Sequence, residues 1–305
     1  MLLLQQMVVL FFLMGIGFFC SKKEIITEEV SKKLSAIVVN IANPALVLTG
    51  CMGENKMEGR ELLMVAGIVA AVYAALVLLA MLIPRLLFIE KKKRGTYQAM
   101  TVFSNIGFMG FPVISAVYGN EALLYASLFM IPYNVLIYTY GVAAMTAGTE
   151  EKKKEGISLG RIFNVGVVAC IVTIIFYLLR ISMPEFIEIT ITHLSNLTAP
   201  LSMMIIGASL SGIHLKKLFM DGKLLLFSFV KLLLIPIVGV LLIRQFVEND
   251  IICGVCMVML ATPVGSMTAM LAQQYDGDYE MASKGVALTT ILSVATMPLV
   301  SMLMG

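Results

Sequence analysis

The chain of 305 residues is 59% hydrophobic and only 13% charged, whereas soluble domains carry roughly a quarter charged residues. This composition excludes a water-soluble globular protein, because too little polar surface remains to cover an exterior that faces water. The net charge of +3 is small and the basic residues lie in separate short loops, which excludes nucleic acid as a partner. The five cysteines are dispersed along apolar runs, which is not the pattern of a disulfide framework.

Ten apolar segments follow one another, each near the length of about 20 residues that a helix needs to cross a bilayer. The first has no basic start and no small-residue cleavage site, so we expect a retained span rather than a signal peptide. The sequence therefore predicts an all-α membrane protein of about ten transmembrane helices. The expected spans are 2–20, 34–52, 62–89, 96–118, 121–147, 162–181, 187–211, 219–245, 251–274 and 279–304.

The basic residues are distributed unevenly between the expected loops. Loops after odd-numbered spans contain 17 of the 22 Lys and Arg residues, and loops after even-numbered spans contain four. Cytoplasmic loops of membrane proteins are enriched in Lys and Arg, so the odd-numbered loops are expected in the cytoplasm. The sequence thus predicts a multi-pass protein of the cell membrane with both termini extracytoplasmic.

The two halves of the chain resemble each other. A shift of 156 residues places Asn40 on Asn196 and Pro44 on Pro200, in spans two and seven. Five spans in each half would make the second half enter the membrane from the opposite side, so the repeats are expected to be inverted, as in many secondary transporters. The predicted domains are a first repeat at 1–147, a cytoplasmic linker at 148–161 and a second repeat at 162–305.

Spans four and nine carry helix-breaking residues near their middles. Span four contains Gly107, Gly110 and Pro112, and proline removes an amide donor while glycine weakens a helix. A broken helix in lipid leaves unpaired backbone groups, which are tolerated where they line a cavity. Two broken helices that cross would direct the positive ends of their half-helices at one place, which suits a carboxylate. The alternative is a pair of proline kinks that serve packing. In span nine, the residues that correspond to the helix-breaking residues of span four are Pro263, Gly265, Ser266 and Thr268.

Neutral polar residues accompany these spans. Asn105 precedes the expected break of span four, and an amide in lipid must find a partner, which is either the substrate or a neighbouring backbone group. Other polar residues flank the prolines of spans two and seven. They are expected either to form the wall of a cavity or to hold helices together, and they are Asn40, Asn43, Asn196 and Thr198.

Charge is scarce inside the expected spans. Their middles contain no Asp or Glu, which argues against a proton antiporter that uses buried carboxylates. Lys231 is the charge that lies well inside a span, and we expect it to snorkel to the cytoplasmic side; neutralisation of substrate and titration are the alternatives. His193 in span seven is expected to pack through a hydrogen bond, with proton coupling as the alternative.

Several motifs together resemble one family. They are N-x-G-x-x-G-x-P from Asn105 to Pro112, NP at Asn43 in span two, and LATPVGSMTAMLAQQY in span nine, followed by AS, TT and MPL. Over essentially the whole chain they are similar to the auxin efflux carrier family, whose bacterial members are usually described as malate or malonate permeases. The resemblance implies two inverted five-helix repeats, crossing helices four and nine, and an elevator-like motion of one bundle against a scaffold. It also implies that Asn105 faces the substrate cavity.

These observations favour a secondary or potential-driven transporter of a small organic anion, a mono- or dicarboxylate, that works by alternating access. The alternatives are a sodium-coupled symporter of the bile-acid and sodium symporter fold group, and a membrane sensor without transport. An enzyme is not expected, since the sequence shows no Ser/His pair, carboxylate pair or metal cluster. The expected partners are a small carboxylate and the lipid bilayer, with a homodimer left open. No cofactor is expected, and coupling to H⁺ or Na⁺ is left open.

Overall fold

The regular secondary structure of the described residues consists of helices. The computed structural model describes residues 2–52, 59–146, 164–212, 218–275 and 277–303. The linker predicted at 148–161 lies outside these residues. The all-α prediction is confirmed for the described residues, whereas the division into two repeats remains a prediction.

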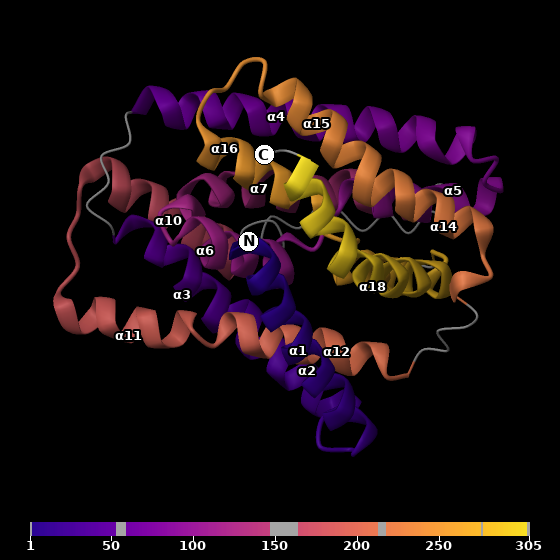
Figure 1. Ribbon diagram of the computed structural model, residues 1–305, viewed down its shortest axis with the longest axis horizontal. Coiled ribbons are helices and arrows are strands. Elements are labelled where there is room, and N and C mark those ends of the chain that lie inside the picture. The colour runs from indigo at the N-terminus through magenta and orange to yellow at the C-terminus, as the bar shows by residue number, and fades with distance from the viewer. Residues whose placement is uncertain (1, 53–58, 147–163, 213–217, 276, 304–305) are drawn as a thin grey trace.

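The helices are joined by short turns, and some of them continue through π or 3₁₀ turns. They are α1 (Leu2–Lys22), α2 (Glu28–Ile37), α3 (Asn43–Leu48), α4 (Gly59–Leu86), α5 (Lys91–Val102), α6 (Phe111–Tyr118), α7 (Ala122–Leu136), α8 (Val142–Thr146), α10 (Val165–Leu179), α11 (Glu185–Ser195), α12 (Thr198–Leu210), α14 (Gly222–Phe229), α15 (Ile235–Ile243), α16 (Asp250–Ala261), α17 (Ser266–Gln274) and α18 (Tyr279–Leu303). The π turns are η1 (Val38–Ala42), η3 (Ile106–Gly110), η4 (Ile137–Gly141) and η5 (Val230–Leu234), and η2 (Thr49–Cys51) is a 3₁₀ turn. In Figure 1, α4 runs along one side of the molecule and α11 and α12 along the opposite side.

Six helical stretches are long and apolar enough to cross a membrane, which supports a multi-pass protein. They are Glu28–Cys51, Glu61–Leu86, Ala122–Met145, Glu185–Leu210, Gly222–Ile243 and Tyr279–Met302. Shorter apolar helices overlap the other four expected spans, at Val8–Lys22, Ile106–Tyr118, Val165–Leu179 and Asp250–Ala261. The multi-pass prediction is therefore confirmed, and ten crossings remain a prediction.

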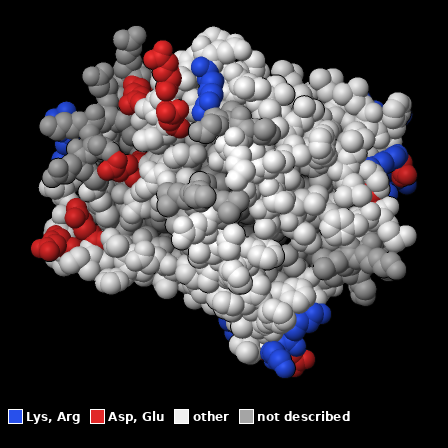
Figure 2. Space-filling model, in the orientation of Figure 1, with Lys and Arg blue, Asp and Glu red and all other residues white. Residues whose placement is uncertain are grey.

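The outer surface suits a lipid environment. Large apolar side chains such as those of Phe12, Phe19 and Leu63 are exposed by 68%, 69% and 76%. In the face shown in Figure 2, the charged side chains lie toward the edges and a broad middle region carries none that is described. Exposed apolar area of this extent would be costly in water and is favourable in a bilayer.

Proline shapes three of the helices. Pro44, Pro112 and Pro236 are each the second residue of an α-helix that directly follows a π turn. Proline cannot donate to the carbonyl four residues earlier and its ring crowds that carbonyl, so the chain widens locally into a π turn. The prolines thus distort these helices without ending them.

Spans two and seven differ from the expected helices. The second span begins at Glu28 instead of 34, because the Thr27 hydroxyl accepts a hydrogen bond from the Val30 N–H and caps the helix there. The seventh span is divided by a turn at Asn196 and Leu197 between α11 and α12. Both members of the paired spans two and seven are therefore irregular just before their prolines.

Helices α1 and α12 are packed backbone against backbone. A Cβ atom at Gly17 would lie 2.0 Å from the Met204 carbonyl oxygen, and one at Gly207 would lie 1.8 Å from the Met14 carbonyl oxygen. Only glycine permits such an approach, which is how small residues bring membrane helices together. The contact joins the first span to the second half of the seventh.

Candidate functional site

The first break lies in the chain of span four between α5 and η3. Helix α5 ends at Val102, and the next helical residue is Ile106. Phe103 has an extended backbone, with φ −97° and ψ 93°, and Asn105 has φ −80° and ψ 59°. The break was expected at Gly107 to Pro112, so the prediction was shifted by about one helical turn. Gly107 and Gly110 lie in η3, and Pro112 is the second residue of α6, which continues the same half-helix.

The second break lies between α16 and α17. Helix α16 ends at Ala261 and α17 begins at Ser266, and Thr262 and Gly265 are extended with ψ angles of 145° and 141°. Pro263 and Gly265 lie within this break, where the sequence placed them. Ser266 begins the second half-helix, and Thr268 follows in its first turn.

The two breaks are hydrogen-bonded to each other. The Asn105 N–H donates to the Pro263 carbonyl over 2.7 Å, and the Gly265 N–H donates to the Phe103 carbonyl over 2.9 Å. Ser104 and Val264 thus form a single antiparallel bridge. These bonds satisfy backbone groups that an interrupted helix leaves unpaired, which is essential away from water.

Gly265 permits the two breaks to approach so closely. A Cβ atom at this position would lie 2.9 Å from the Ser104 carbonyl oxygen, closer than real Cβ atoms come. The neighbouring Val264 N–H donates over 3.0 Å to the hydroxyl of Thr289 on α18. The second break is therefore held both by the first break and by α18.

Buried polar atoms without a partner gather beside the breaks. Asn105 and Asn43 are only 4% and 5% exposed, and Thr268 is fully buried. Among the described residues, no hydrogen-bond partner exists for Nδ2 of Asn105, Oδ1 of Asn43 or Oγ1 of Thr268. Buried polar atoms are nearly always paired, so these groups have hydrogen-bonding capacity that a ligand or water can fill.

Spans two and seven contribute to the surroundings of the first break. A Cβ atom at Gly107 would lie 3.3 Å from Nδ2 of Asn43, so Asn43 lies against η3. Helix α12 also contacts η3 and carries the buried Thr198 and Ser202, whose hydroxyl oxygens have no partner among the described residues. Asn43 thus lies beside the first break, and a cavity shared by Asn43, Asn105 and Thr198 stays a prediction, to which the burial of Ser202 on the same helix adds a further candidate.

Other candidates lie away from this region. Asn40 is exposed, and its amide donates to the Ala36 carbonyl of its own helix over 2.9 Å. Asn196 is exposed in the turn between α11 and α12. His193 is exposed on α11, so the packing role expected for it is wrong. The sequence repeat identified Asn40 and Asn196 as equivalent, but it could not show that both face outward.

The position of Lys231 differs most from the prediction made from the sequence. It lies in η5 and is fully buried, and its Nζ donates to the Thr101 carbonyl over 2.9 Å and to Oγ of Ser104 over 2.7 Å. The expectation that it snorkels to the cytoplasmic side is therefore wrong. Thr101 lies in the last turn of α5, so the ammonium interacts with the negative end of that helix at the first break.

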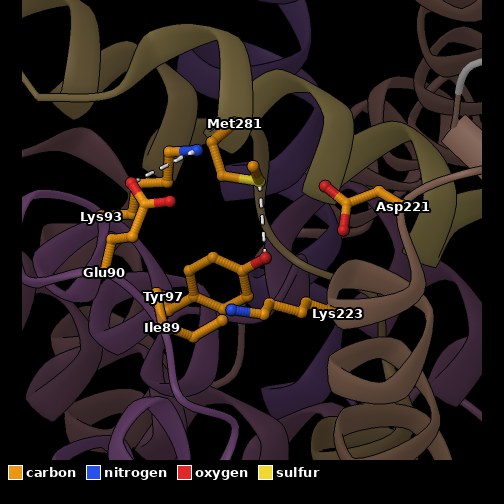
Figure 3. Close-up of a pocket in the computed structure, with 7 residues that line it drawn as sticks. All are labelled: Ile89, Glu90, Lys93, Tyr97, Asp221, Lys223 and Met281. Atoms are coloured by element: carbon orange, nitrogen blue, oxygen red, sulfur yellow. Dashed lines mark hydrogen bonds and ion pairs between the residues drawn. The ribbon is translucent and has the colours of Figure 1, made fainter.

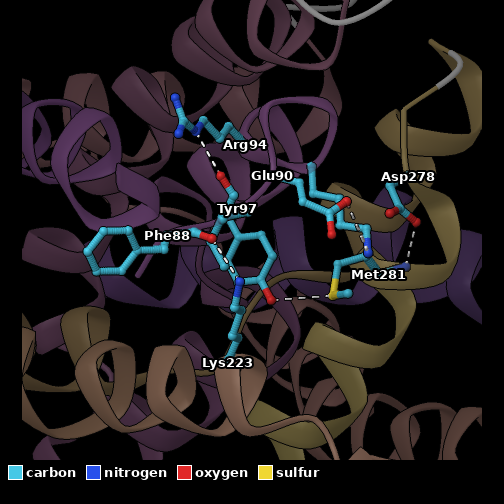
Figure 4. Close-up of polar contacts among 9 residues, drawn as sticks. Phe88, Glu90, Arg94, Tyr97, Lys223, Asp278 and Met281 are labelled. Carbon is cyan, nitrogen blue, oxygen red and sulfur yellow. Dashed lines mark hydrogen bonds and ion pairs between the residues drawn. The ribbon is translucent and has the colours of Figure 1, made fainter. Parts of the chain in front are cut away.

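A separate hollow of about 50 Å³ lies where α5, α14 and α18 begin (Figure 3). Its lining is Ile89, Glu90, Lys93, Tyr97, Asp221, Lys223 and Met281. Several of these groups are bonded to protein: Lys223 donates to the Phe88 carbonyl over 2.8 Å, and Tyr97 donates to Sδ of Met281 over 3.5 Å (Figure 4). A hollow of this volume holds a few waters. The unpartnered amide of Asn105 and hydroxyl of Thr268 lie at the breaks instead, which are therefore the candidate site.

Comparisons with known proteins agree with these features. A family model described as membrane transport protein matches residues 2–301. An uncharacterized transporter of Methanocaldococcus jannaschii is 24% identical over 305 residues, which cover 98% of each chain. A second uncharacterized transporter, from Methanothermobacter thermautotrophicus, is 23% identical over 95% of this chain and 94% of its own. A Rhizobium meliloti protein named "Putative malonate transporter" is 25% identical over 86% of this chain and 83% of its own. With a match over nearly its whole length, the chain belongs to the membrane transport protein family, that of the auxin efflux carriers.

Proposed function

We propose that this protein transports a small mono- or dicarboxylate across the membrane by alternating access, with the substrate bound beside the two breaks. The observation that carries the proposal is the bonded pair of breaks with the unpartnered amide of Asn105 and hydroxyl of Thr268 beside it. These side-chain groups can donate hydrogen bonds to a carboxylate, because neither of them takes part in the backbone bonds between the breaks.

The charge distribution around the breaks supports an anionic substrate. Half-helices begin after each break, at Ile106 and at Ser266, and the start of a helix carries partial positive charge and free N–H groups. Among the described residues no Asp or Glu is buried, so no carboxylate competes for this field. The name of the Rhizobium meliloti relative is consistent with a dicarboxylate of three carbons.

The spacing of the breaks supports inverted repeats. The first half-helices end at Val102 and Ala261, 159 positions apart, and the second halves begin at Ile106 and Ser266, 160 positions apart. Two equivalent helices related by a pseudo-twofold axis would meet at equivalent residues in antiparallel directions, as Ser104 and Val264 do. The offset exceeds the 156 residues of spans two and seven, so short insertions separate the repeats.

The burial of the site supports alternating access. Asn105 is 4% exposed and Thr268 is fully buried, so a solute reaches them only when helices move. In the proposed motion, the two breaks travel together because backbone hydrogen bonds join them, and α18 travels with them because Thr289 accepts from the Val264 N–H. The scaffold in this proposal contains α1 and α12, whose backbones are in direct contact.

The test is uptake of labelled malonate by proteoliposomes that contain the purified chain. We expect saturable uptake, and we expect Asn105→Ala to lower it at least about tenfold while the protein remains monodisperse. Asn120→Ala is the matched control, since Asn120 is exposed between α6 and α7 and far in sequence from the second break. Equal uptake by Asn105→Ala and wild type would remove Asn105 from the site. Absence of uptake across a panel of mono- and dicarboxylates, in inward and outward gradients, would contradict the proposed function.

A further inference from the structure

Lys231 places a charge at the centre of the molecule with no acidic partner. Among the described residues it is the only Lys, Arg, Asp or Glu that is buried. The ion pairs formed by those residues do not include it. A buried charge is costly unless oriented dipoles or hydrogen bonds compensate for it. Here the compensation comes from the Thr101 carbonyl and the Ser104 hydroxyl.

The groups that surround the ammonium are those that bind a monovalent cation. Both acceptors are oxygen atoms, and Thr101 belongs to the last turn of α5, where the helix dipole is negative. A hard metal ion at this place would have the same two oxygens among its ligands, at the shorter distances of about 2.0–2.6 Å that such ions use in proteins. Because Nζ of Lys231 already occupies the place, a metal ion has no room there.

The shape of η5 brings Lys231 to this position. The residue lies in a π turn that precedes Pro236, and such a turn inserts one residue into the helical register. The helix that carries η5 also contacts α16, which ends where the second break begins, and α18, whose Thr289 accepts a hydrogen bond from Val264 in that break. Lys231 therefore connects the first break to the helices around the second.

We propose that Lys231 is a positioning residue whose ammonium is a built-in cation: it fixes the first break in the shape that presents Asn105 to the substrate, and it replaces a bound metal ion at this place. The proposal rests on the proposed function as a carboxylate transporter. Ser104, which accepts from Lys231, directly precedes Asn105, whose N–H is bonded to Pro263. Substrate binding should therefore require the ammonium and should not require sodium.

The first test measures malonate binding to the purified full-length chain in sodium, potassium or choline chloride. We expect the same affinity in the three salts. Lys231→Met, which keeps the length and volume of the side chain, should weaken binding at least about tenfold. Lys223→Met is the matched control, because Lys223 is exposed and donates to the Phe88 carbonyl at the edge of the molecule. Wild-type affinity in Lys231→Met, or a requirement for sodium in the wild type, would overturn the proposal.

The second test does not depend on the substrate. Lys231→Ala removes the ammonium and leaves the two oxygens, so n-propylammonium should raise the melting temperature of this variant. Neutral n-propanol should not do so, and neither compound should raise that of the wild type. Equal effects of the two compounds would show that stabilisation comes from filling the cavity and not from the positive charge. That result would overturn the proposal.

The outcomes separate this proposal from the proposed function. Rescue by n-propylammonium without carboxylate binding by the wild type would support the built-in cation and contradict the carboxylate carrier. If the wild type binds carboxylate and Lys231→Met binds it equally well, the carboxylate carrier is supported and the built-in cation is contradicted. If Lys231→Ala is not monodisperse, Ser104→Ala replaces it: removal of one acceptor should weaken malonate binding at least about threefold, and wild-type affinity would count against the proposal.

Discussion

The N–H of Asn105 donates to the carbonyl of Pro263 over 2.7 Å, although 158 positions of sequence separate the two residues. This bond joins a break in the first half of the chain to a break in the second half. Neither half could keep its interrupted helix in lipid without the backbone groups of the other. Substitutions at the breaks and around them should therefore affect both halves together.

Gly265→Val should separate the breaks. The added Cβ would lie 2.9 Å from the Ser104 carbonyl oxygen, so the bridge between Ser104 and Val264 must open. We expect a loss of at least about tenfold in malonate uptake and a lower melting temperature, because overpacking of this kind costs about 1–3 kcal/mol. Gly67→Ala in α4 is the control, since a Cβ atom there would meet no other atom within 4 Å and alanine favours a helix. Normal uptake by Gly265→Val would show that the close approach is dispensable.

Asn43 and Asn40 should respond differently to the same substitution. Asn43→Ala removes a buried amide that lies against Gly107, and should lower malonate uptake at least about tenfold. Asn40→Ala removes an exposed amide bonded to its own helix, and uptake should stay within about twofold of wild type. The comparison is made in proteoliposomes at equal protein content. An equal loss in both variants would indicate a general effect on span two instead of a binding role for Asn43.

Thr289→Val should destabilise the second break. The Val264 N–H would lose its acceptor while remaining buried, and an unsatisfied buried donor costs about 1–3 kcal/mol. Thr289→Ser keeps the hydroxyl and should restore most of the lost melting temperature and uptake. Both variants are compared by thermal unfolding in detergent and by malonate uptake. A serine variant as impaired as the valine variant would point to packing of the methyl group as the important contribution.

The predicted orientation places the starts of α5 and α11 on opposite sides of the membrane. In a background without the five cysteines, Ser182→Cys should react in intact cells with a maleimide that does not cross membranes. Lys92→Cys should react only after the membrane is permeabilised. Both positions are exposed, so accessibility within the protein is similar. The reverse pattern would invert the topology, and labelling of both in intact cells would contradict the span assignment between them.

The sequence was most informative where physical chemistry leaves few choices. Composition determined that the chain lies in lipid, and Pro263 with Gly265 marked the second break correctly, because both residues are in the extended segment itself. The first break was placed about one turn late. Gly107 and Pro112 lie in the helical residues after the break. Phe103 to Asn105 contain no Gly or Pro, and their backbone partners lie in the second break.

The direction of side chains was beyond the sequence. Asn40 and Asn43 are three positions apart on one helical stretch, yet Asn40 in η1 is exposed and Asn43 at the start of α3 is buried. Lys231 was recognised as unusual, but its partners Thr101 and Ser104 are about 130 positions away, and no local pattern indicates them. Contacts of this kind depend on how the two halves come together, which a single sequence does not display.

The bonds between the breaks also limit how tightly a solute can be held. The N–H groups of Asn105, Val264 and Gly265 are already engaged with protein oxygens. In the proposed carrier, recognition would therefore fall to a few side-chain donors and the first turns of two short helices. A substrate bound by so few groups should bind with modest affinity and dissociate readily. A carrier must release its substrate in every transport cycle, so modest affinity favours a high turnover rate. The turnover rate should therefore depend more on the rate of helix movement than on additional contacts to the substrate.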